Sequence, residues 1–535
     1  MESQRSFSAI VLHAHLPYVR HPEHRRFNEE LWLFEAITET YLPLISMLER
    51  LAEDGLRHCL TLSLSPTLLT MLEDPLLKAR YQEHLQRLGA LAREESRRLR
   101  KEAGFGPVAH FYRERIEAIR KQWEAHNGDL ISAFSTLRAQ GVAELITSAA
   151  THAYLPLLRA DPASIRAQLQ LGALTFRRFF GVPAEGVWLP ECGYFPGLED
   201  EIARAGFRYF FVDSHGIEQA TPRPRDGVTA PLVCENGVAV FGRDPLSSRL
   251  VWSREEGYPG DPLYRDFYRD IGFERPLDAL HPFLLDGQSR IHTGLKYHRI
   301  TGPADDKLPY QPEIAARRAE LHAEDFLARI AHAAREGKAR GDGSPSIRVS
   351  LYDAELFGHW WFEGPLWLEA VIRRQMLERK EPALVTPSVY LQGVRRLQCA
   401  TPAASSWGDG GYNAFWLNPD TDWMYPLLHQ AGRQMQTLAK RFGQEKPDSL
   451  AGRALRQAGR SLLLAQASDW AFLQRTGTAG SYADRQVRAH LQRFDYLRAC
   501  LEDQALDERR LQALETMDHI FPEFDPAIFA EPSLA

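Results

Sequence analysis

The chain has 535 residues, of which 44% are hydrophobic and 25% charged, and its formal net charge is −6. This composition is typical of a soluble globular protein of two or three domains. It argues against nucleic-acid binding, because the densest basic run, residues 93–101, also contains acids and predicts a solvated helix face. No stretch approaches the ~20 apolar residues of a membrane span, so no membrane contact is expected.

The cysteines and the N-terminus predict a cytoplasmic location. The five cysteines are an odd number, and no two form a CxxC pair. They therefore predict neither a disulfide framework nor a zinc ribbon. The N-terminal apolar run, residues 7–13, is too short for a signal peptide, and no small-residue cleavage site follows it.

Short apolar runs that end in a polar residue recur along the chain. The polar residues at or just after these ends are His13, His15, His152, Glu191, Asp213, His215 and Asp353. Helical patterns lie between the runs, and this β-then-α order predicts buried parallel strands. In closed α/β barrels, functional residues gather at the carboxyl ends of the strands. The sequence therefore predicts an α/β barrel with one shared site.

Two other regions are helical throughout. Between residues 75 and 128, two apolar stripes flank the break "GFGP" and predict an inserted helical hairpin. Past residue 395 the strands stop, and further helical stripes follow. We expect a catalytic barrel over 1–75 and 130–395, a hairpin over 76–129, and a helical domain over 396–535 that contributes to the cleft.

Glu191 and Asp353 are the candidate catalytic acids. Glycoside chemistry needs two carboxyl groups, and retaining enzymes hold them roughly 5–5.5 Å apart. The acid must keep its proton near neutral pH, which burial among aromatic side chains assists. Asp353 has such a shell nearby in the sequence: Tyr352, Phe357, Trp360 and Trp361. A single strand-end carboxylate is more often structural, but two in aromatic-rich motifs favour catalysis.

The pair His13 and His15 has three possible roles. Residues i and i+2 of a strand face the same way, so two imidazoles on one side could hold a metal. A zinc site needs a third ligand, however, and no HxxxH spacing supplies one. Hydrogen bonding to a sugar hydroxyl is favoured over both metal binding and a structural role, and His152 is interpreted in the same way.

Tryptophans cluster in the second half of the chain, which contains a glycine-rich loop over 405–425. Trp407 and Trp416 lie there among Gly, Asn and Asp, a composition that favours a sugar-stacking surface over a packed core. In the stretch 467–483, Asp469 could accept bonds from sugar hydroxyls or cap a helix.

Five sequence motifs, taken together, resemble those of glycoside hydrolase family 57, and within it those of the 1,4-α-glucan branching enzymes. The motifs are "HAHLPYVRHPE", "THAYLPLL", "GVWLPECGY", "SLYDAELFGHWWFEGP" and "SSWGDGGYNAFWLNP". The resemblance covers about residues 7–500. It implies a (β/α)7 barrel with an inserted hairpin and a C-terminal helical domain. It also implies a retaining mechanism without a metal or an organic cofactor.

The resemblance also implies roles for single residues. Glu191 matches the nucleophile and Asp353 the general acid/base. The matching or nearby residues expected to bind substrate are His13, His152, Trp188, Tyr258, Arg269, Trp360, Trp407, Trp416, Asp469 and Thr478. The first family motif often reads His-Gln-Pro, and the departure here leaves the role of His15 open. The Pro- and Gly-rich segment 216–262 is expected to form a mobile loop over the acceptor, with Tyr258 at its tip.

The expected reaction cleaves an α-1,4 bond of amylose, amylopectin or glycogen and makes an α-1,6 branch. The protein is expected to be a monomer or a small homo-oligomer. The nearest alternative is a hydrolytic α-amylase or a 4-α-glucanotransferase of the same fold. Further alternatives are a metal-dependent deacetylase or mannosidase that uses His13 and His15, and a glucan-binding protein without catalysis.

Overall fold

A ring of parallel strands lies at the centre of the computed structural model, which describes residues 6–253, 256–284, 289–302, 306–338, 345–394 and 396–531. The strands are β1 (Ser6–Ala14), β2 (Leu60–Leu64), β3 (Ala143–Ser148), β4 (Gly186–Trp188), β5 (Tyr209–Val212), β7 (Ala239–Gly242) and β8 (Ser346–Asp353). They pair in the order β8-β1-β2-β3-β4-β5-β7. A bridge between Arg243 and Val349 joins β7 back to β8. The predicted (β/α)7 barrel is confirmed.

Alternate residues of these strands belong to two separate hydrophobic clusters. Val11, Phe211 and Leu351 lie in the smaller cluster, which fills the ring. Phe210 and Val212, which flank Phe211 in the sequence and face the other side of β5, lie in the larger cluster between the ring and the helices. Both faces of each strand are therefore buried, which explains why the sequence shows continuous apolar runs.

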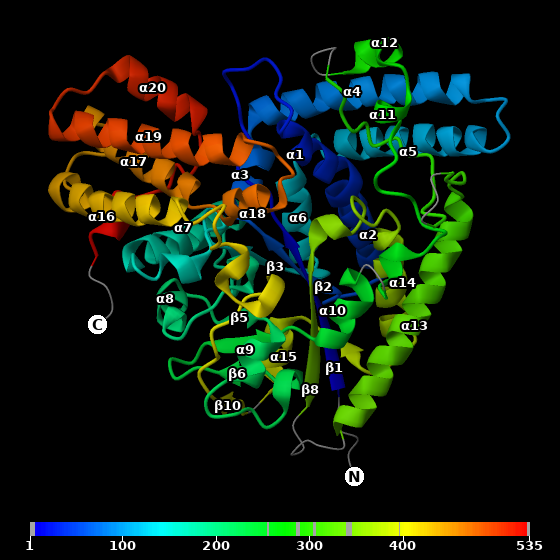
Figure 1. The fold of residues 1–535 in the computed structure, drawn as a ribbon. Coiled ribbons are helices and arrows are strands. Elements are labelled where there is room, and N and C mark those ends of the chain that lie inside the picture. Colours follow the sequence, from blue (N-terminus) through cyan, green and yellow to red (C-terminus); the bar gives the residue numbers. More distant parts are fainter. Residues whose placement is uncertain are drawn as a thin grey trace.

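Helices cover the outside of the ring (Figure 1). Those nearest to the strands in sequence are α1 (Glu30–Ala36), α2 (Leu42–Glu53), α3 (Pro66–Glu73), α6 (Leu130–Ala139), α7 (Pro162–Phe180), α8 (Leu198–Arg204), α9 (Ser214–Glu218), α10 (Pro245–Trp252), α13 (Pro312–Lys338), α14 (Gly364–Leu377) and α15 (Pro387–Gly393). A π-helical turn, η1 (Ile37–Tyr41), joins α1 to α2. Three two-residue strands, β6 (Leu232–Val233), β9 (Ala383–Leu384) and β10 (Gln398–Cys399), extend the sheet.

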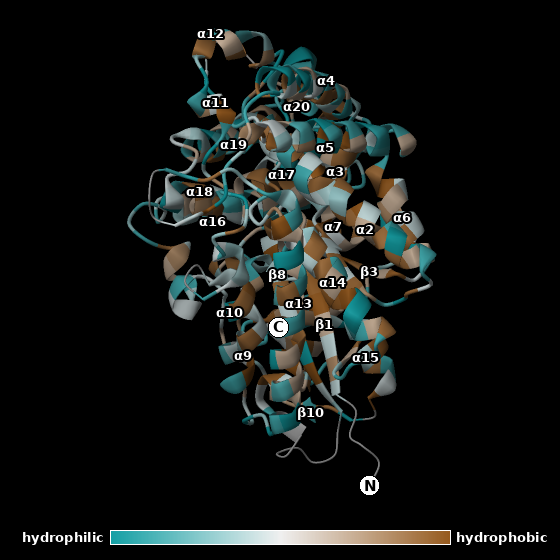
Figure 2. Ribbon diagram, turned by 90° about the vertical axis from the view of Figure 1, so that its right-hand side faces the viewer, coloured by the Kyte–Doolittle hydropathy of each residue, from teal (hydrophilic) through white to brown (hydrophobic). Residues whose placement is uncertain are grey.

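The inserted hairpin consists of α4 (Pro75–Arg98) and α5 (Phe105–Ala125), which lie side by side at one end of the molecule (Figure 1). The predicted apolar stripes face inward: Tyr81, Leu85, Leu88, Ala92, Tyr112, Ile116, Ile119 and Trp123 are all buried. The remaining surface of α4 is hydrophilic, whereas the strands are largely hydrophobic (Figure 2). Two short helices, α11 (Ile271–Glu274) and α12 (Leu277–Leu280), lie near this hairpin.

The C-terminal part is helical, as predicted. It contains α16 (Met424–Phe442), α17 (Leu450–Ala465), α18 (Ser468–Thr476), α19 (Tyr482–Glu502) and α20 (Glu508–Met517). Ser449 caps α17 by accepting a hydrogen bond from the backbone N–H of Gly452. This helical part packs against α7 beside the barrel (Figure 1). In the part of the chain that the structure describes, no helix combines the length and apolar content needed to cross a membrane.

Candidate active site

His13 and Asp353 define one side of the site. They are register partners on the neighbouring strands β1 and β8. Because strand side chains alternate, His13 lies on the same face as Val11, and Asp353 on the same face as Leu351. Val11 and Leu351 belong to the cluster inside the ring. His13 and Asp353 therefore point into the ring at the carboxyl ends of their strands, where barrel sites form.

Glu191 occupies a constrained turn after β4. It and Cys192 both adopt the left-handed region, with φ of 60° and 50°. Such backbone strain in non-glycine residues persists only where surrounding contacts fix it, and it concentrates at functional sites. Here the backbone N–H of Trp407 donates to the carbonyl of Glu191 at 3.0 Å. The turn thus aims the carboxylate of Glu191 inward, and the buried Cys192 packs behind it.

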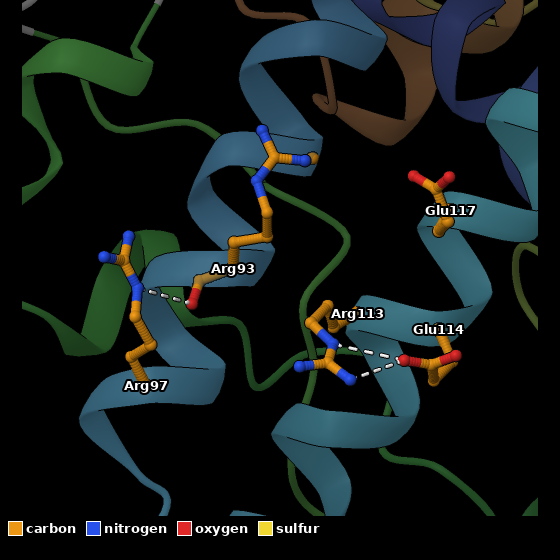
Figure 3. Close-up of a pocket in the computed structure, with 6 residues that line it drawn as sticks. Arg93, Arg97, Arg113, Glu114 and Glu117 are labelled. Atoms are coloured by element: carbon orange, nitrogen blue, oxygen red, sulfur yellow. Dashed lines mark hydrogen bonds and ion pairs between the residues drawn. The ribbon is translucent and has the colours of Figure 1, made fainter.

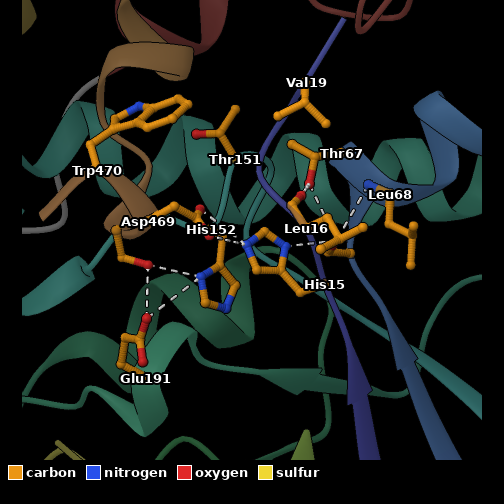
Figure 4. Close-up of polar contacts among 12 residues, drawn as sticks. His15, Leu16, Val19, Thr67, Leu68, Thr151, His152, Glu191, Asp469 and Trp470 are labelled. Carbon is orange, nitrogen blue, oxygen red and sulfur yellow. Dashed lines mark hydrogen bonds and ion pairs between the residues drawn. The ribbon is translucent and has the colours of Figure 1, made fainter. Parts of the chain in front are cut away.

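Two donors from the C-terminal part of the chain hold the Glu191 carboxylate. Trp407 Nε1 donates to Oε2 at 2.9 Å, and Ser468 Oγ donates to Oε1 at 3.0 Å. Ser468 also contacts His152 Nδ1 at 2.9 Å, and the Nε2 atoms of His152 and His13 are 2.9 Å apart. A continuous polar chain therefore runs from Glu191 to His13, the strand neighbour of Asp353. Figure 4 shows the part of this arrangement around Glu191 and His152.

Both acids are buried, but their polar neighbours differ. Burial raises the pKa of Asp353 well above its ordinary value, the charges of Glu355 and Glu191 raise it further, and the charge of Arg243 acts against the rise. Burial also raises the pKa of Glu191, and the charge of Asp469 adds to this, but the hydrogen bonds from Trp407 and Ser468 act against the rise. Donors to a carboxylate favour its charged form, whereas neighbouring acids favour the protonated form. This arrangement suits Glu191 as the charged nucleophile and Asp353 as the proton donor.

Three imidazoles stack beside the acids. His15 and His152 have ring centroids 3.8 Å apart, and His13 follows at 5.0 Å from His152. Burial lowers the pKa of His13 and of His152 well below the ordinary value, and His15 adds to this effect. Both are therefore neutral near pH 7 and can exchange hydrogen bonds with hydroxyl groups.

These histidines also form a candidate metal cluster. One ring nitrogen of each, from His13, His15 and His152, lies within 4.8 Å of the others. His152 is thus the third imidazole that the sequence spacing does not show. All six ring nitrogens nevertheless have partners: Ser63 and His152 for His13, Ser65 and Asp469 for His15, Ser468 and His13 for His152. An ion would have to break several of these bonds.

Asp469 contacts the site instead of capping a helix. The N-cap position of α18 is Ala467, and the Asp469 carboxylate lies 3.1 Å from His15 Nε2 (Figure 4). This contact answers what His15 does: its ring joins the barrel to the C-terminal domain, since its Nδ1 also contacts Ser65 at 2.9 Å.

Sequence reasoning missed two charged residues and Ser468. Glu355, two residues after Asp353, accepts hydrogen bonds from the Tyr41 hydroxyl at 2.5 Å and from the His15 backbone N–H at 3.2 Å. Arg243 follows β7 and contacts Asp213 at 3.3 Å. The strand-end rule that selected Glu191 could have found Arg243. Ser468 carries no such signal because serines are common at helix starts.

Two tryptophans expected to contact substrate are buried. Trp416 is 1% exposed and stacks on Tyr154 with centroids 4.3 Å apart, so the prediction that it stacks on sugar is wrong. Trp188 is 0% exposed and stacks on His13 at 4.7 Å. It therefore shapes the site by packing against the His13 imidazole and has no exposed face for substrate.

Three further predicted residues have partners other than the two acids. Tyr258 is buried against α13, where its hydroxyl donates to Asp325 at 2.8 Å, so the prediction of an exposed loop tip is wrong. Residues 254 and 255 of the expected mobile loop lie outside the described residues. Arg269 forms an ion pair with Glu274. Thr478 is exposed, and its hydroxyl bonds that of Thr476. Trp360, the last of the predicted substrate-binding residues, is 56% exposed, so its ring is accessible to a ligand.

A surface pocket on the hairpin has no connection to the acids. It lies between α4 and α5 and is lined by Gly89, Arg93, Arg97, Arg113, Glu114 and Glu117 (Figure 3). Arg113 pairs with Glu114 at 2.6 Å, and Arg97 donates to the carbonyl of Arg93 at 3.4 Å. These groups satisfy one another, and such exposed pairs contribute little energy.

Two family descriptions match the sequence. That of glycosyl hydrolase family 57 matches residues 9–400, and that of the C-terminal part of 1,4-alpha-glucan branching enzyme matches residues 427–529. The first range contains both acids and the three histidines. The second contains Ser468 and Asp469, which contact Glu191 and His15.

The chain is similar to known proteins over nearly its whole length. It is 34% identical to a 1,4-alpha-glucan branching enzyme of Thermococcus kodakarensis, over 97% of this chain and 77% of the relative. The crystal structure of the Thermotoga maritima alpha-amylase AmyC superposes with a TM-score of 0.92 at 40% identity, covering 99% of this chain and 100% of that one. For the Pyrococcus horikoshii GH57-type branching enzyme these values are 0.87 and 33%, with 99% and 98% covered.

Proposed function

The chain belongs to glycosyl hydrolase family 57, and from that premise we propose that it is a 1,4-α-glucan branching enzyme. The observation that supports this most is the C-terminal match over residues 427–529. That segment supplies Ser468, which bonds the Glu191 carboxylate, and Asp469, which bonds His15. The part of the chain that resembles branching enzymes thus contacts the reacting group itself.

In the first step, Glu191 attacks the anomeric carbon of an α-1,4 bond. The bond between that carbon and the glycosidic oxygen breaks, and Asp353 gives its proton to the departing oxygen. A covalent glycosyl-enzyme ester remains on Glu191. The raised pKa of Asp353 supports this assignment because a general acid must be protonated near neutral pH.

In the second step, Asp353 acts as a base. It takes the proton from the 6-hydroxyl of an acceptor glucan, and the oxygen of that hydroxyl attacks the anomeric carbon of the ester. An α-1,6 branch forms, Glu191 is released, and Asp353 is protonated again. Two inversions at the same carbon retain its configuration. In this proposal the neutral His13 and His152 exchange their present hydrogen bonds for bonds to sugar hydroxyls when glucan binds.

We assign amylose, amylopectin and glycogen as substrates and glycogen biosynthesis as the process. A cytoplasmic location is part of the proposal, and the five unpaired cysteines support it. We further propose domain bounds of 1–75 and 130–395 for the barrel, 76–129 for the hairpin and 396–535 for the helical domain. A monomer or small homo-oligomer completes the proposal.

Hydrolysis is the second candidate activity, because the structure similar at 40% identity is named an alpha-amylase. The two reactions share the first step and differ only in whether a sugar hydroxyl or water attacks the ester. The same two acids serve both.

The test is to incubate the enzyme with amylose, treat the product with a debranching enzyme and size the released chains. A branching enzyme yields new short chains after debranching and few reducing ends before it. If new reducing ends appear without new α-1,6 linkages, the activity is hydrolysis and the branching assignment is wrong. Transfer products that are all linear would instead indicate a 4-α-glucanotransferase.

A further inference from the structure

Three aromatic side chains form an exposed row that the proposed reaction does not use. Tyr268 is 72% exposed and Trp360 is 56% exposed. The half-buried Phe267 contacts both, with ring centroids 5.3 Å from Tyr268 and 5.8 Å from Trp360. We call these three residues the aromatic platform. Contiguous exposed apolar side chains on a soluble protein mark a binding surface.

Buried charge holds the Phe267 side of the platform in place. Lys296 is 2% exposed, donates to the backbone carbonyl of Phe267 at 2.6 Å, and places its ammonium 4.1 Å from the Phe267 ring centroid. The Asp266 carboxylate accepts a hydrogen bond from the backbone N–H of Tyr268 at 2.8 Å. The backbone under both rings is therefore fixed by charge-assisted hydrogen bonds.

A second buried cation holds the Trp360 side. Arg265 is 3% exposed and donates to the carbonyl of His359, next to Trp360, at 2.7 Å. The His359 ring bonds Glu39 at 2.5 Å. Burying Lys and Arg is costly unless their hydrogen bonds are satisfied. Here Lys296 donates to Phe267, and Arg265 donates to His359 and pairs with Glu39 at 3.3 Å, so both cations fix backbone that presents exposed rings, which pre-organises the platform for a ligand.

The platform and the catalytic centre share one structural support. The π-helical turn η1 contributes Glu39, which bonds His359, and Tyr41, which bonds Glu355 beside Asp353. Trp360 itself lies on the segment that follows β8 and Asp353. The same turn therefore supports both the residue before Trp360 and the acid beside Asp353.

We infer that Phe267, Tyr268 and Trp360 form a second α-glucan-binding subsite outside the cleavage centre. The inference rests on the proposed function, because a glucan is the ligand class assigned there. Glucose rings present C–H faces that stack on aromatic rings, while their hydroxyls need polar neighbours. The next residue in the chain, Arg269, is 39% exposed in its side chain and pairs with Glu274, 29% exposed, so charged groups follow Tyr268 directly in the sequence. A chain held here while another part of it enters the cleavage centre is kept on the enzyme by two contacts instead of one.

The test measures binding on a Glu191→Gln background, so that glucan is not consumed. The double variant Tyr268→Ala/Trp360→Ala should bind amylopectin about tenfold more weakly than its parent, since two stacking contacts are lost. Binding of maltotriose, short enough to fill the cleavage centre alone, should stay unchanged. Trp360→Phe should retain most of the amylopectin affinity. Affinity gel electrophoresis measures the dissociation constant for amylopectin, and calorimetry measures that for maltotriose.

Phe273→Ala is the matched control, because Phe273 is 49% exposed and contacts His292 instead of the platform. Unchanged amylopectin binding in the double variant would overturn the inference while leaving the proposed function standing. Equal loss of both ligands would overturn it too, since the effect would then lie in the centre. A parent that binds neither glucan would overturn both proposals. Dissociation of a parent oligomer by the double variant would make the platform a protein interface.

Discussion

The two acids of the candidate site lie at the ends of barrel strands and burial raises the pKa of both, but the groups that contact them differ. The region around Glu191 is rich in donors: Trp407 and Ser468, both from the C-terminal part of the chain, bond its carboxylate. The region around Asp353 is rich in acids, and Glu355 and Glu191 both raise its pKa. Two carboxyl groups thus take different catalytic roles because their neighbours differ. Substituting each neighbour therefore tests the role assigned to the acid that it contacts.

Removal of the acids themselves should give the largest effect. We expect Glu191→Ala to lower kcat at least ~10⁴-fold, and Asp353→Ala by roughly 10²–10⁴-fold. With a maltooligosyl fluoride, whose leaving group needs no proton, azide should then restore turnover differently, because it replaces a different group in each variant. It should form a glycosyl azide of inverted configuration with Glu191→Ala and of retained configuration with Asp353→Ala. NMR of the anomeric proton distinguishes the two products, and one shared configuration would contradict the assignment.

Loss of the donor to Glu191 should come next. Trp407→Phe removes the indole N–H but keeps an aromatic ring, and we expect kcat/KM to fall about tenfold. The hydrogen bond lowers the pKa of Glu191, so its removal raises that pKa. Because the nucleophile must be ionised, the acidic limb of the pH–rate profile should move to higher pH. Trp423→Phe, which alters a ring stacked on Arg488 in the helical domain, should leave the profile unchanged. An unmoved acidic limb in Trp407→Phe would refute the donor role.

Neutralising the acid beside Asp353 should shift the opposite limb. Burial raises the pKa of Glu355 to about 7, and above that pH its charge raises the pKa of Asp353; Glu355→Gln removes this charge, so the pKa of Asp353 should fall. Activity requires protonated Asp353 and is lost as pH rises through its pKa. The alkaline limb should therefore move to lower pH, by about one unit. The exposed Glu378→Gln serves as control, since Glu378 pairs with Lys380 at 2.7 Å. A shift to higher pH would contradict the argument.

Metal removal should have the smallest effect. Every ring nitrogen of His13, His15 and His152 already has a hydrogen-bond partner. We therefore expect activity to be unchanged after incubation with EDTA and gel filtration, with elemental analysis before and after. Stoichiometric zinc whose removal abolishes turnover would show that these nitrogens bind an ion instead.

Much of this fold could be predicted from local pattern. Apolar runs such as residues 7–12 predict buried strands because both faces pack, and the structure places them in a ring. The helical stripes were equally predictable, since a period near 3.6 residues aligns apolar side chains on one face. The buried faces of α4 and α5 follow those stripes. Glu191 and Asp353 could be selected because strand ends in a barrel share one rim.

Local pattern failed where burial depends on distant segments. Trp416 lies in a glycine-rich loop that suggests exposure, yet Tyr154 covers its ring. Tyr258 lies in a Pro- and Gly-rich segment, yet α13 covers it. In both cases the covering residue is far away in sequence, so composition gives no sign of it.

The sequence by itself determined the order of strands and helices, the phase of their apolar faces and the two acids at strand ends. These properties depend on side-chain periodicity and turn chemistry within a few residues. The tertiary structure alone decided which groups surround each acid. Ser468 reaches Glu191, and His152 reaches His13, only because folding brings together residues 277 and 139 positions apart. Since protonation depends on burial and near charges, the roles of the acids follow from those contacts.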